Sequence, residues 1–126
     1  MKNATRKWLE FARKDLNSGE ILFQGKAYEG AIYHCHQAIE KILKAIVTEK
    51  EIKLRKTHDL VGLIADAKIS LPQNIISFIE ELNPYYQPIR YPDAFLESKT
   101  AYSRLTTKTI LKKTQETIKW IENLII

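Results

Sequence analysis

The sequence predicts an all-α fold: an antiparallel up-and-down bundle of four main helices and one short helix, in a single domain that spans residues 1–126. Between Tyr28 and Val47, apolar residues recur at intervals of three and four, the period of one helical face, for about five turns. A stripe this regular must pack against other helices, because an isolated helix gains little from it. Glycine and proline are scarce, with four of each, and 126 residues are enough for one core. We therefore expect this stretch to be the central helix.

The first expected helix runs from about Asn3 to Gln24 and carries an apolar inner face. Gly25 should end it, because glycine accepts the left-handed conformation that is usual just past a helix terminus. Asp15 lies beside the apolar stripe, so we expect it to be partly buried. A buried carboxylate needs a partner, which would be a Lys or Arg of another helix or a backbone donor.

The second expected helix continues from Tyr28 to about Lys50. Glu40 and Lys44 have the spacing of a favourable ion pair, which we place on the solvated side of this helix. Residues 50–56 carry four positive charges and one negative charge, and they indicate a basic loop.

A short helix is expected from near Thr57 to about Ala67, with the Thr57 hydroxyl as its cap and Asp59 in its first turn. Pro72 is tolerated as a first helical residue, so a further helix should run from Pro72 to about Leu82.

The next segment, Asn83 to Asp93, contains three prolines within nine residues, which forbid a continuous helix. The last helix should run from about Ser98 to Leu124. Its expected inner face consists of Tyr102, Leu105, Ile110, Ile118, Ile121 and Ile125. Arg104, Lys108 and Lys112 form a basic row at four-residue spacing.

The net charge of +5 is unevenly distributed. Residues 1–98 carry 14 Lys or Arg and 13 Asp or Glu, whereas residues 99–126 carry 6 and 2. The basic excess therefore belongs mainly to the last helix and indicates an anionic partner on one side of the molecule. The lone Cys35, the absence of a secretory signal and the lack of a long apolar run predict a cytoplasmic protein with no membrane segment.

Four short patterns occur in order and at suitable distances along the chain. They are Trp8…Ala12…Asp15-Leu16, Tyr28…Ala31…Gln37-Ala38…Glu40-Lys41, Lys56-Thr57-His58-Asp59-Leu60 and Arg90-Tyr91-Pro92-Asp93. Together they resemble the HEPN domain, a small helical domain named for higher eukaryotes and prokaryotes nucleotide-binding. The resemblance covers nearly the whole chain.

The resemblance implies a helical bundle that commonly dimerises. It also implies a partner, because stand-alone prokaryotic members are often encoded beside a minimal nucleotidyltransferase as toxin–antitoxin modules. Many HEPN domains are metal-independent ribonucleases whose signature is an Arg followed after four to six residues by a His. Here the positions that follow Arg90 at that spacing are Phe95, Leu96 and Glu97, and those that follow Arg104 are Thr109, Ile110 and Leu111. The sequence therefore favours a non-enzymatic binding module and does not decide whether the protein is an enzyme.

The candidate nucleotide- or RNA-binding residues are Arg90, Tyr91, Asp93, Tyr85, His58 and Lys41. Arg90, also the catalytic candidate, would bind a phosphate while a nearby tyrosine stacks on a base. The alternative is that Arg90 pairs with a carboxylate and the tyrosines only hold the proline-rich loop. His58 would act as a donor or acid–base group at a helix start, or else would anchor the loop by hydrogen bonds.

No metal or cofactor is predicted. His34 and His36 are two residues apart on a helix, so their side chains point in different directions. His36 and Glu40 are spaced as a pair, but two ligands are too few for a structural zinc site. His34, Gln37, Lys41 and Lys44 form a polar stripe that would line a dimer cleft. The leading hypothesis is a homodimeric HEPN module that engages a nucleotidyltransferase, a nucleotide or RNA. The alternatives are a ribonuclease toxin with an altered active site, in which His58 or a tyrosine replaces the missing His, and a purely structural dimeric subunit.

Overall fold

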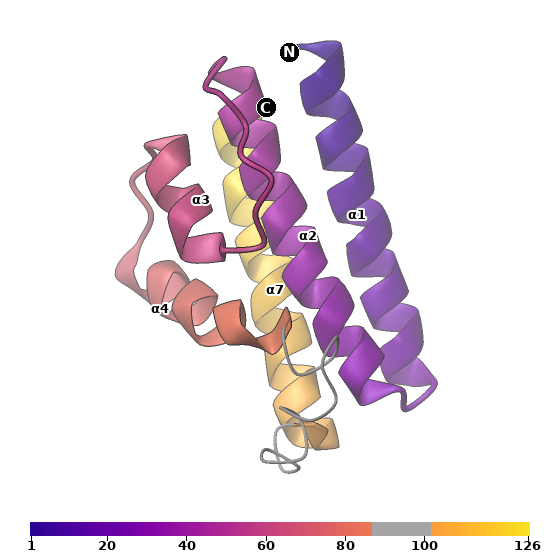
Figure 1. Ribbon diagram of the computed structural model, residues 1–126. Helices are drawn as coiled ribbons and strands as arrows, with labels where there is room; N and C mark the ends of the chain where they lie inside the picture. Colours follow the sequence, from indigo (N-terminus) through magenta and orange to yellow (C-terminus); the bar gives the residue numbers. More distant parts are fainter. Residues whose placement is uncertain (87–101) are drawn as a thin grey trace.

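The computed structural model describes residues 1–86 and 102–126, and all the regular secondary structure in these ranges is helical (Figure 1). The elements are α1 (Asn3–Gln24), α2 (Tyr28–Glu49), α3 (Leu60–Ala67), α4 (Gln73–Leu82), the 3₁₀ turn η1 (Asn83–Tyr85) and α7 (Arg104–Ile125). The predicted all-α helical bundle is confirmed. None of the described helices is long and apolar enough to cross a bilayer.

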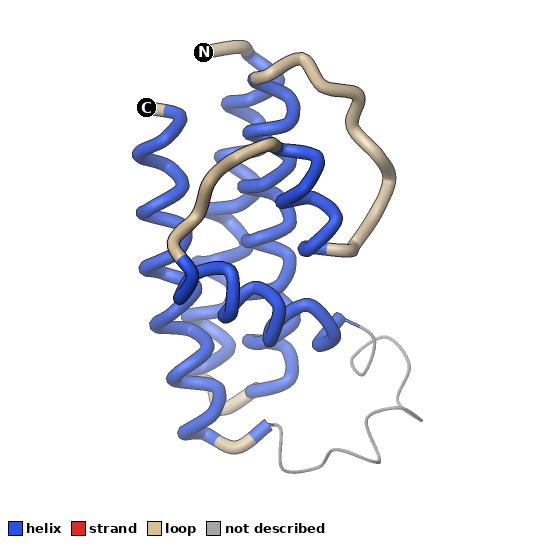
Figure 2. Tube along the Cα trace, turned by 90° about the vertical axis from the view of Figure 1, so that its left-hand side faces the viewer, coloured by secondary structure: helices blue, strands red, loops and turns tan. Residues whose placement is uncertain are grey.

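The helices α1 and α2 form the most extensive pair of the bundle, and α7 packs against both. Figure 1 shows α1 running antiparallel to α2 and to α7, so that the two chain ends lie at the same end of the molecule. The shorter α3 and α4 cover the other side of α2 and α7, and Figure 2 shows α4 lying across the long helices rather than along them. This arrangement makes α2 the central helix, as predicted.

The core is built around α2, whose apolar stripe is almost completely inaccessible to solvent. Its fully buried members include Ile32, Cys35, Ile39, Ile42, Leu43 and Val47. Gly19 of α1 allows α2 to approach closely, because a Cβ built there would lie 3.3 Å from the backbone oxygen of Ala31. The burial of Cys35 raises the pKa of its thiol to about 12, mainly because the thiolate would lose its hydration.

The turn between α1 and α2 differs from the prediction in one detail. The helix α1 ends at Gln24 as expected, and the Gly25 amide donates to the Ile21 carbonyl, 3.0 Å away. The left-handed residue is however Lys26, with φ of 63°, whereas Gly25 has φ of −82°. The expected role of Gly25 as the left-handed residue was therefore wrong.

The short helix α3 begins later than predicted. It starts at Leu60, with Asp59 as the N-cap residue, and the Thr57 hydroxyl accepts a hydrogen bond from the Asp59 amide instead of capping the helix. The Leu60 amide is bound by a residue from far along the chain: Asn83 Oδ1 accepts from it at 2.7 Å. Similarly, Pro72 precedes α4 as its N-cap residue and is not its first helical residue.

The last helix, α7, begins at Arg104, and the Ser103 hydroxyl accepts a hydrogen bond from the Thr106 amide, 3.1 Å away. The predicted start at about Ser98 was too early, because Ser103 is extended, with φ of −69° and ψ of 158°, and precedes the helix as its N-cap; Ser98 itself lies outside the described residues. Leu105 was expected to face inward but is 75% exposed. It lies five residues before buried Ile110, which places it about 140° around the helix from that residue.

Candidate functional site

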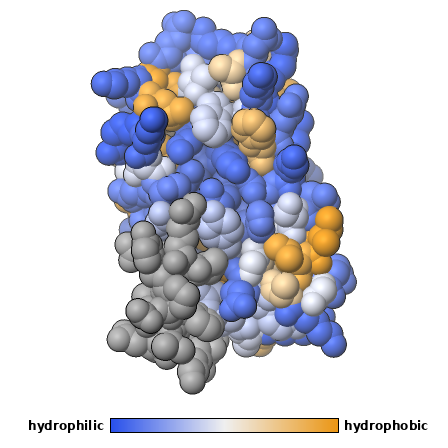
Figure 3. Space-filling model, turned by 45° about the vertical axis from the view of Figure 1, so that its right-hand side comes forward, coloured by the Kyte–Doolittle hydropathy of each residue, from blue (hydrophilic) through white to orange (hydrophobic). Residues whose placement is uncertain are grey.

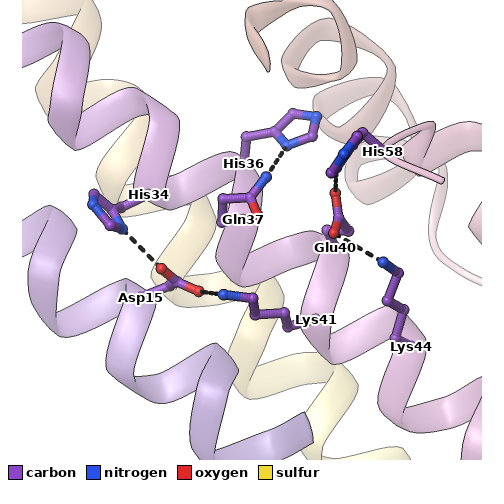
Figure 4. Close-up of polar contacts among 8 residues, drawn as sticks. All are labelled: Asp15, His34, His36, Gln37, Glu40, Lys41, Lys44 and His58. Carbon is purple, nitrogen blue, oxygen red and sulfur yellow. Dashed lines mark hydrogen bonds and ion pairs between the residues drawn. The ribbon is translucent and has the colours of Figure 1, made fainter. Parts of the chain in front are cut away.

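Two carboxylates, Asp15 of α1 and Glu40 of α2, are buried beside the core and are each bound to one lysine and one histidine. Their exposed fractions are 8% and 3%. We call the six residues involved the α2 charged cluster: Asp15, His34, Glu40, Lys41, Lys44 and His58 (Figure 4). Buried charges are rare unless they are paired, so this cluster is the principal polar feature of the interior.

Asp15 joins α1 to α2. His34 Nδ1 lies 2.8 Å from Asp15 Oδ1, and the Lys41 ammonium donates to the second carboxylate oxygen (Figure 4). The sequence predicted that Asp15 is partly buried and is paired with a group such as a lysine of another helix, and the structure confirms both points. Lys41, one of the predicted binding residues, therefore has a structural role, because it pairs with Asp15 of α1.

Glu40 joins α2 to the loop that precedes α3. His58 Nδ1 lies 2.8 Å from Glu40 Oε1, and the Lys44 ammonium donates to Glu40 Oε2 over 3.0 Å. The predicted Glu40–Lys44 pair is therefore present, but its expected solvated position was wrong, because Lys44 is only 8% exposed. The Lys44 ammonium also lies 5.5 Å from the centre of the Trp8 ring, which helps to hold it in this partly apolar site.

His36 lies next to this cluster and is not part of it. Its side chain is completely buried, and its Nε2 atom has no hydrogen-bond partner among the described residues. The Nδ1 atom forms a hydrogen bond of 3.4 Å with Gln37 Nε2. His36 and Glu40 have the spacing of a pair on the helix, but no hydrogen bond joins them. Burial lowers the pKa of His36 to about 4, only partly offset by the nearby Glu40 carboxylate.

His36 and His58 both stack on Tyr86. The ring centres of His58 and Tyr86 are 4.3 Å apart, and those of His36 and Tyr86 are 5.8 Å apart, with interplanar angles of 21° and 29°. Tyr86 follows η1 directly, so these contacts fix the end of η1 against α2 and the loop before α3. Tyr86 is one of the tyrosines near Arg90 that were expected to stack on a base, although the candidate site residues included its neighbour Tyr85 and not Tyr86.

A pocket of about 550 Å³ opens next to His58. Its lining residues are Lys56, Thr57, His58, Asp59, Glu80, Asn83, Pro84 and Tyr86. Asn83 organises one wall, because its Nδ2 donates to Asp59 Oδ1 at 3.0 Å while its Oδ1 holds the start of α3. This hydrogen bond is the main reason that the pKa of Asp59 is lowered, so the pocket keeps an anionic group beside Lys56 and His58.

The predicted site residues are divided among three places. His58 lines the pocket, Lys41 lies on the α1 side of α2, and Tyr85 packs at a steep angle on Tyr102, with ring centres 6.4 Å apart. Arg90, Tyr91 and Asp93 lie outside the described residues. The structure therefore brings His58 together with Lys56, Asn83 and Tyr86.

Most of the residues that line the pocket carry polar or charged side chains. Because Nδ1 of His58 is held by Glu40, the ring has one other nitrogen with which to contact a ligand, and its plane is fixed by Tyr86. Within residues 1–86 and 102–126, no group of three or more His, Cys, Asp or Glu side chains is arranged to hold a metal ion.

The face formed by α1 and α2 is mainly hydrophilic but includes hydrophobic patches (Figure 3). On α1, Phe11 and Ile21 are 47% and 62% exposed. Phe11 contacts the half-buried Trp8 edge to face, with ring centres 6.1 Å apart. Phe11 and Ile21 are the two large apolar side chains of α1 that are exposed to solvent.

The fold and the site define a small helical domain with a polar pocket beside its central helix. The sequence matches the HEPN domain family over residues 5–124, so the chain belongs to the HEPN domain family. The resemblance found in the sequence is thereby confirmed.

Several known proteins are similar to this chain. One is the protein named "Putative toxin MJ1304" of Methanocaldococcus jannaschii, which is 27% identical over 97 residues, or 70% of this chain. That match covers 63% of the relative's length. The crystal structure of TT1696 from Thermus thermophilus is 27% identical and superimposes with a TM-score of 0.85, covering 97% of this chain and 98% of the other.

A second solved structure is that of ST0689, an archaeal HEPN homologue. It has a TM-score of 0.80 and 24% identity, with full coverage of both chains at 100%. At this level of identity the similarity shows the shared fold alone.

Proposed function

We propose that this protein is the HEPN component of a HEPN–minimal nucleotidyltransferase pair of the toxin–antitoxin type, and that it is a dimer that binds a nucleotide or RNA. Two comparisons support the proposal: membership of the HEPN family and similarity to a relative that is named as a toxin. The structural observation that carries it is the pocket beside the His58–Glu40 pair.

The lining of this pocket suits a ligand that has both negative charge and hydrogen-bonding groups. Lys56, and His58 when protonated, attract phosphate oxygens, whereas Asp59 and Glu80 accept hydrogen bonds from a base or a sugar. A simple anion would be repelled by Asp59 and Glu80 and has no donor with which to bind them. A nucleotide presents donors and phosphates together, and is therefore the better fit.

Dimerisation would use the face of α1 and α2. The exposed Phe11 and Ile21 supply apolar area there, and the neighbouring Lys41 and His34 are only partly exposed. An isologous contact requires a self-complementary surface, because the same patch of the two subunits meets across the two-fold axis.

The experiment uses isothermal titration calorimetry with ATP, GTP, CTP and UTP, and light scattering after size exclusion to determine the oligomeric state. We expect one or more of the nucleotides to bind to a dimer. His58→Gln and Lys56→Gln should each weaken binding at least several-fold, whereas Lys53→Gln, an exposed lysine that does not line the pocket, should leave binding unchanged. A monomer that binds neither nucleotides nor RNA would overturn the proposal.

The pocket geometry also favours one second candidate, a metal-independent ribonuclease. A buried carboxylate that orients a histidine is the usual arrangement of an acid–base group, and Glu40 holds His58 in this way. Incubation with end-labelled RNA in EDTA distinguishes the two functions. Cleavage by the wild type that disappears in His58→Gln and in Arg90→Ala would support the ribonuclease, whereas intact RNA in every lane would exclude it under those conditions.

A further inference from the structure

A separate cationic surface lies along α7, on residues that the proposed nucleotide pocket does not use. Helix α7 contains five Lys or Arg residues and two Glu residues. Arg104, Lys108 and Lys112 are exposed, and none of them forms an ion pair with a described residue. We call these three residues the α7 basic row.

The row is regular because each cation is one helical turn, about 6 Å along the axis, from the next. Its first member is held in place: the Arg104 guanidinium lies 5.4 Å from the centre of the Phe23 ring at the end of α1. Such a contact fixes the direction of the guanidinium while leaving its N–H groups available.

The other two cations border a pocket of about 360 Å³ between the end of α1 and α7. Phe23 and Leu111 supply apolar surface there, and Gln24 and Gln115 supply amides. The single carboxylate of this pocket, Glu20, accepts a hydrogen bond from Gln115 at 2.9 Å and forms no ion pair with Lys108 or Lys112.

We infer that the α7 basic row and this pocket bind the backbone of single-stranded RNA. Three cations in a line, none of which forms an ion pair with a described residue, suit consecutive phosphates, and the adjoining apolar surface and amides suit an unpaired base. The inference rests on the proposed function and deepens it, because it assigns RNA a surface separate from the His58 pocket.

The test measures the anisotropy of a fluorescein-labelled oligouridylate as a function of salt concentration. Each phosphate contact contributes about 0.7 to the slope of log K against log salt for a single strand. Arg104→Gln/Lys108→Gln/Lys112→Gln should therefore weaken binding and reduce the slope by about 2. Arg104→Lys/Lys108→Arg/Lys112→Arg should keep the slope of the wild type.

The control is Lys7→Gln/Lys53→Gln/Lys68→Gln, which removes the same charge from exposed positions that do not line the α7 pocket. Its slope should match the wild type. If this control loses as much affinity and slope as Arg104→Gln/Lys108→Gln/Lys112→Gln, only net charge matters and the inference is overturned. Circular dichroism should show that all three variants are folded to the same extent.

Two outcomes separate this inference from the proposed function. If mononucleotides bind in a His58-dependent way but the wild type does not bind oligouridylate, only the α7 surface is overturned. If RNA binding depends on the α7 basic row and no ligand depends on His58, the inference holds and the His58 pocket is overturned.

Discussion

Replacement of Glu40 by glutamine should destabilise the protein strongly. The substitution conserves volume but removes the charge that faces Lys44, whose side chain is only 10% exposed. Breaking a buried ion pair by removal of one partner leaves an uncompensated charge in a poorly solvated site and typically costs about 3–5 kcal/mol. Because the glutamine amide keeps one oxygen that accepts hydrogen bonds, we expect a value near the lower end, about 3 kcal/mol.

The assay is urea unfolding at pH 7, followed by far-ultraviolet circular dichroism. With a typical urea dependence of about 1–3 kcal/mol per molar, the midpoint should fall by roughly 1–3 M. The matched control is Glu122→Gln, which breaks the pair with Arg13, whose side chain is 53% exposed. An exposed pair of this kind is worth less than about 1 kcal/mol.

A double variant tests the cause of the loss. If the cost of Glu40→Gln comes from the unpaired ammonium, Lys44→Met in the same chain should recover much of the stability. A loss for Glu40→Gln no greater than that for Glu122→Gln would refute the reasoning. A double variant as unstable as the sum of the single variants would refute it as well.

Three further predictions concern the core. Because burial lowers the pKa of His36 from 6.5 to about 4, the unfolded chain binds a proton between these pH values and the folded chain does not. This contribution to stability is therefore complete above pH 6.5 and is lost on acidification toward pH 4, by up to about 3 kcal/mol. The free energy of unfolding in urea should differ less between pH 7 and pH 5 in His36→Gln than in the wild type. An equal difference in the two proteins would contradict the assignment. Since burial raises the pKa of the Cys35 thiol to about 12, Ellman's reagent should react with it at pH 8 only after unfolding, and prompt reaction of the folded protein would argue against this environment. Gly19→Val should lower stability by about 1–3 kcal/mol in a thermal melt, because its Cβ would press on the Ala31 carbonyl 3.3 Å away, and an unchanged melting temperature would show that α1 and α2 separate without cost.

Local patterns were sufficient for α1 and α2. The period of the apolar residues predicted α1 with its observed bounds and α2 to within one residue, because a helix that packs on one core repeats the same face along its length. The type of partner that Asp15 has was also predicted, because a carboxylate that is buried beside an apolar stripe needs a cation or a hydrogen-bond donor. The basic row of α7 was visible in the sequence, although its lack of ion-pair partners among the described residues was not.

Local patterns failed where a residue far along the chain decides the local structure. The start of α3 was placed too early because Asn83, and not Thr57, holds the Leu60 amide. The solvated position expected for Glu40 and Lys44 was wrong for the same kind of reason. The i,i+4 spacing predicts that the two side chains meet, but it contains no information about what covers them.

The sequence by itself determined the helical class, the central role of α2 and, through four short patterns, the HEPN family. Only the tertiary structure decided which charges are buried and which histidine each carboxylate meets. Asp15 and His34 are 19 residues apart, and Glu40 and His58 are 18 apart. The physical reason is that periodicity fixes the direction of a side chain around its own helix, whereas its environment depends on packing between helices and loops that no local pattern specifies.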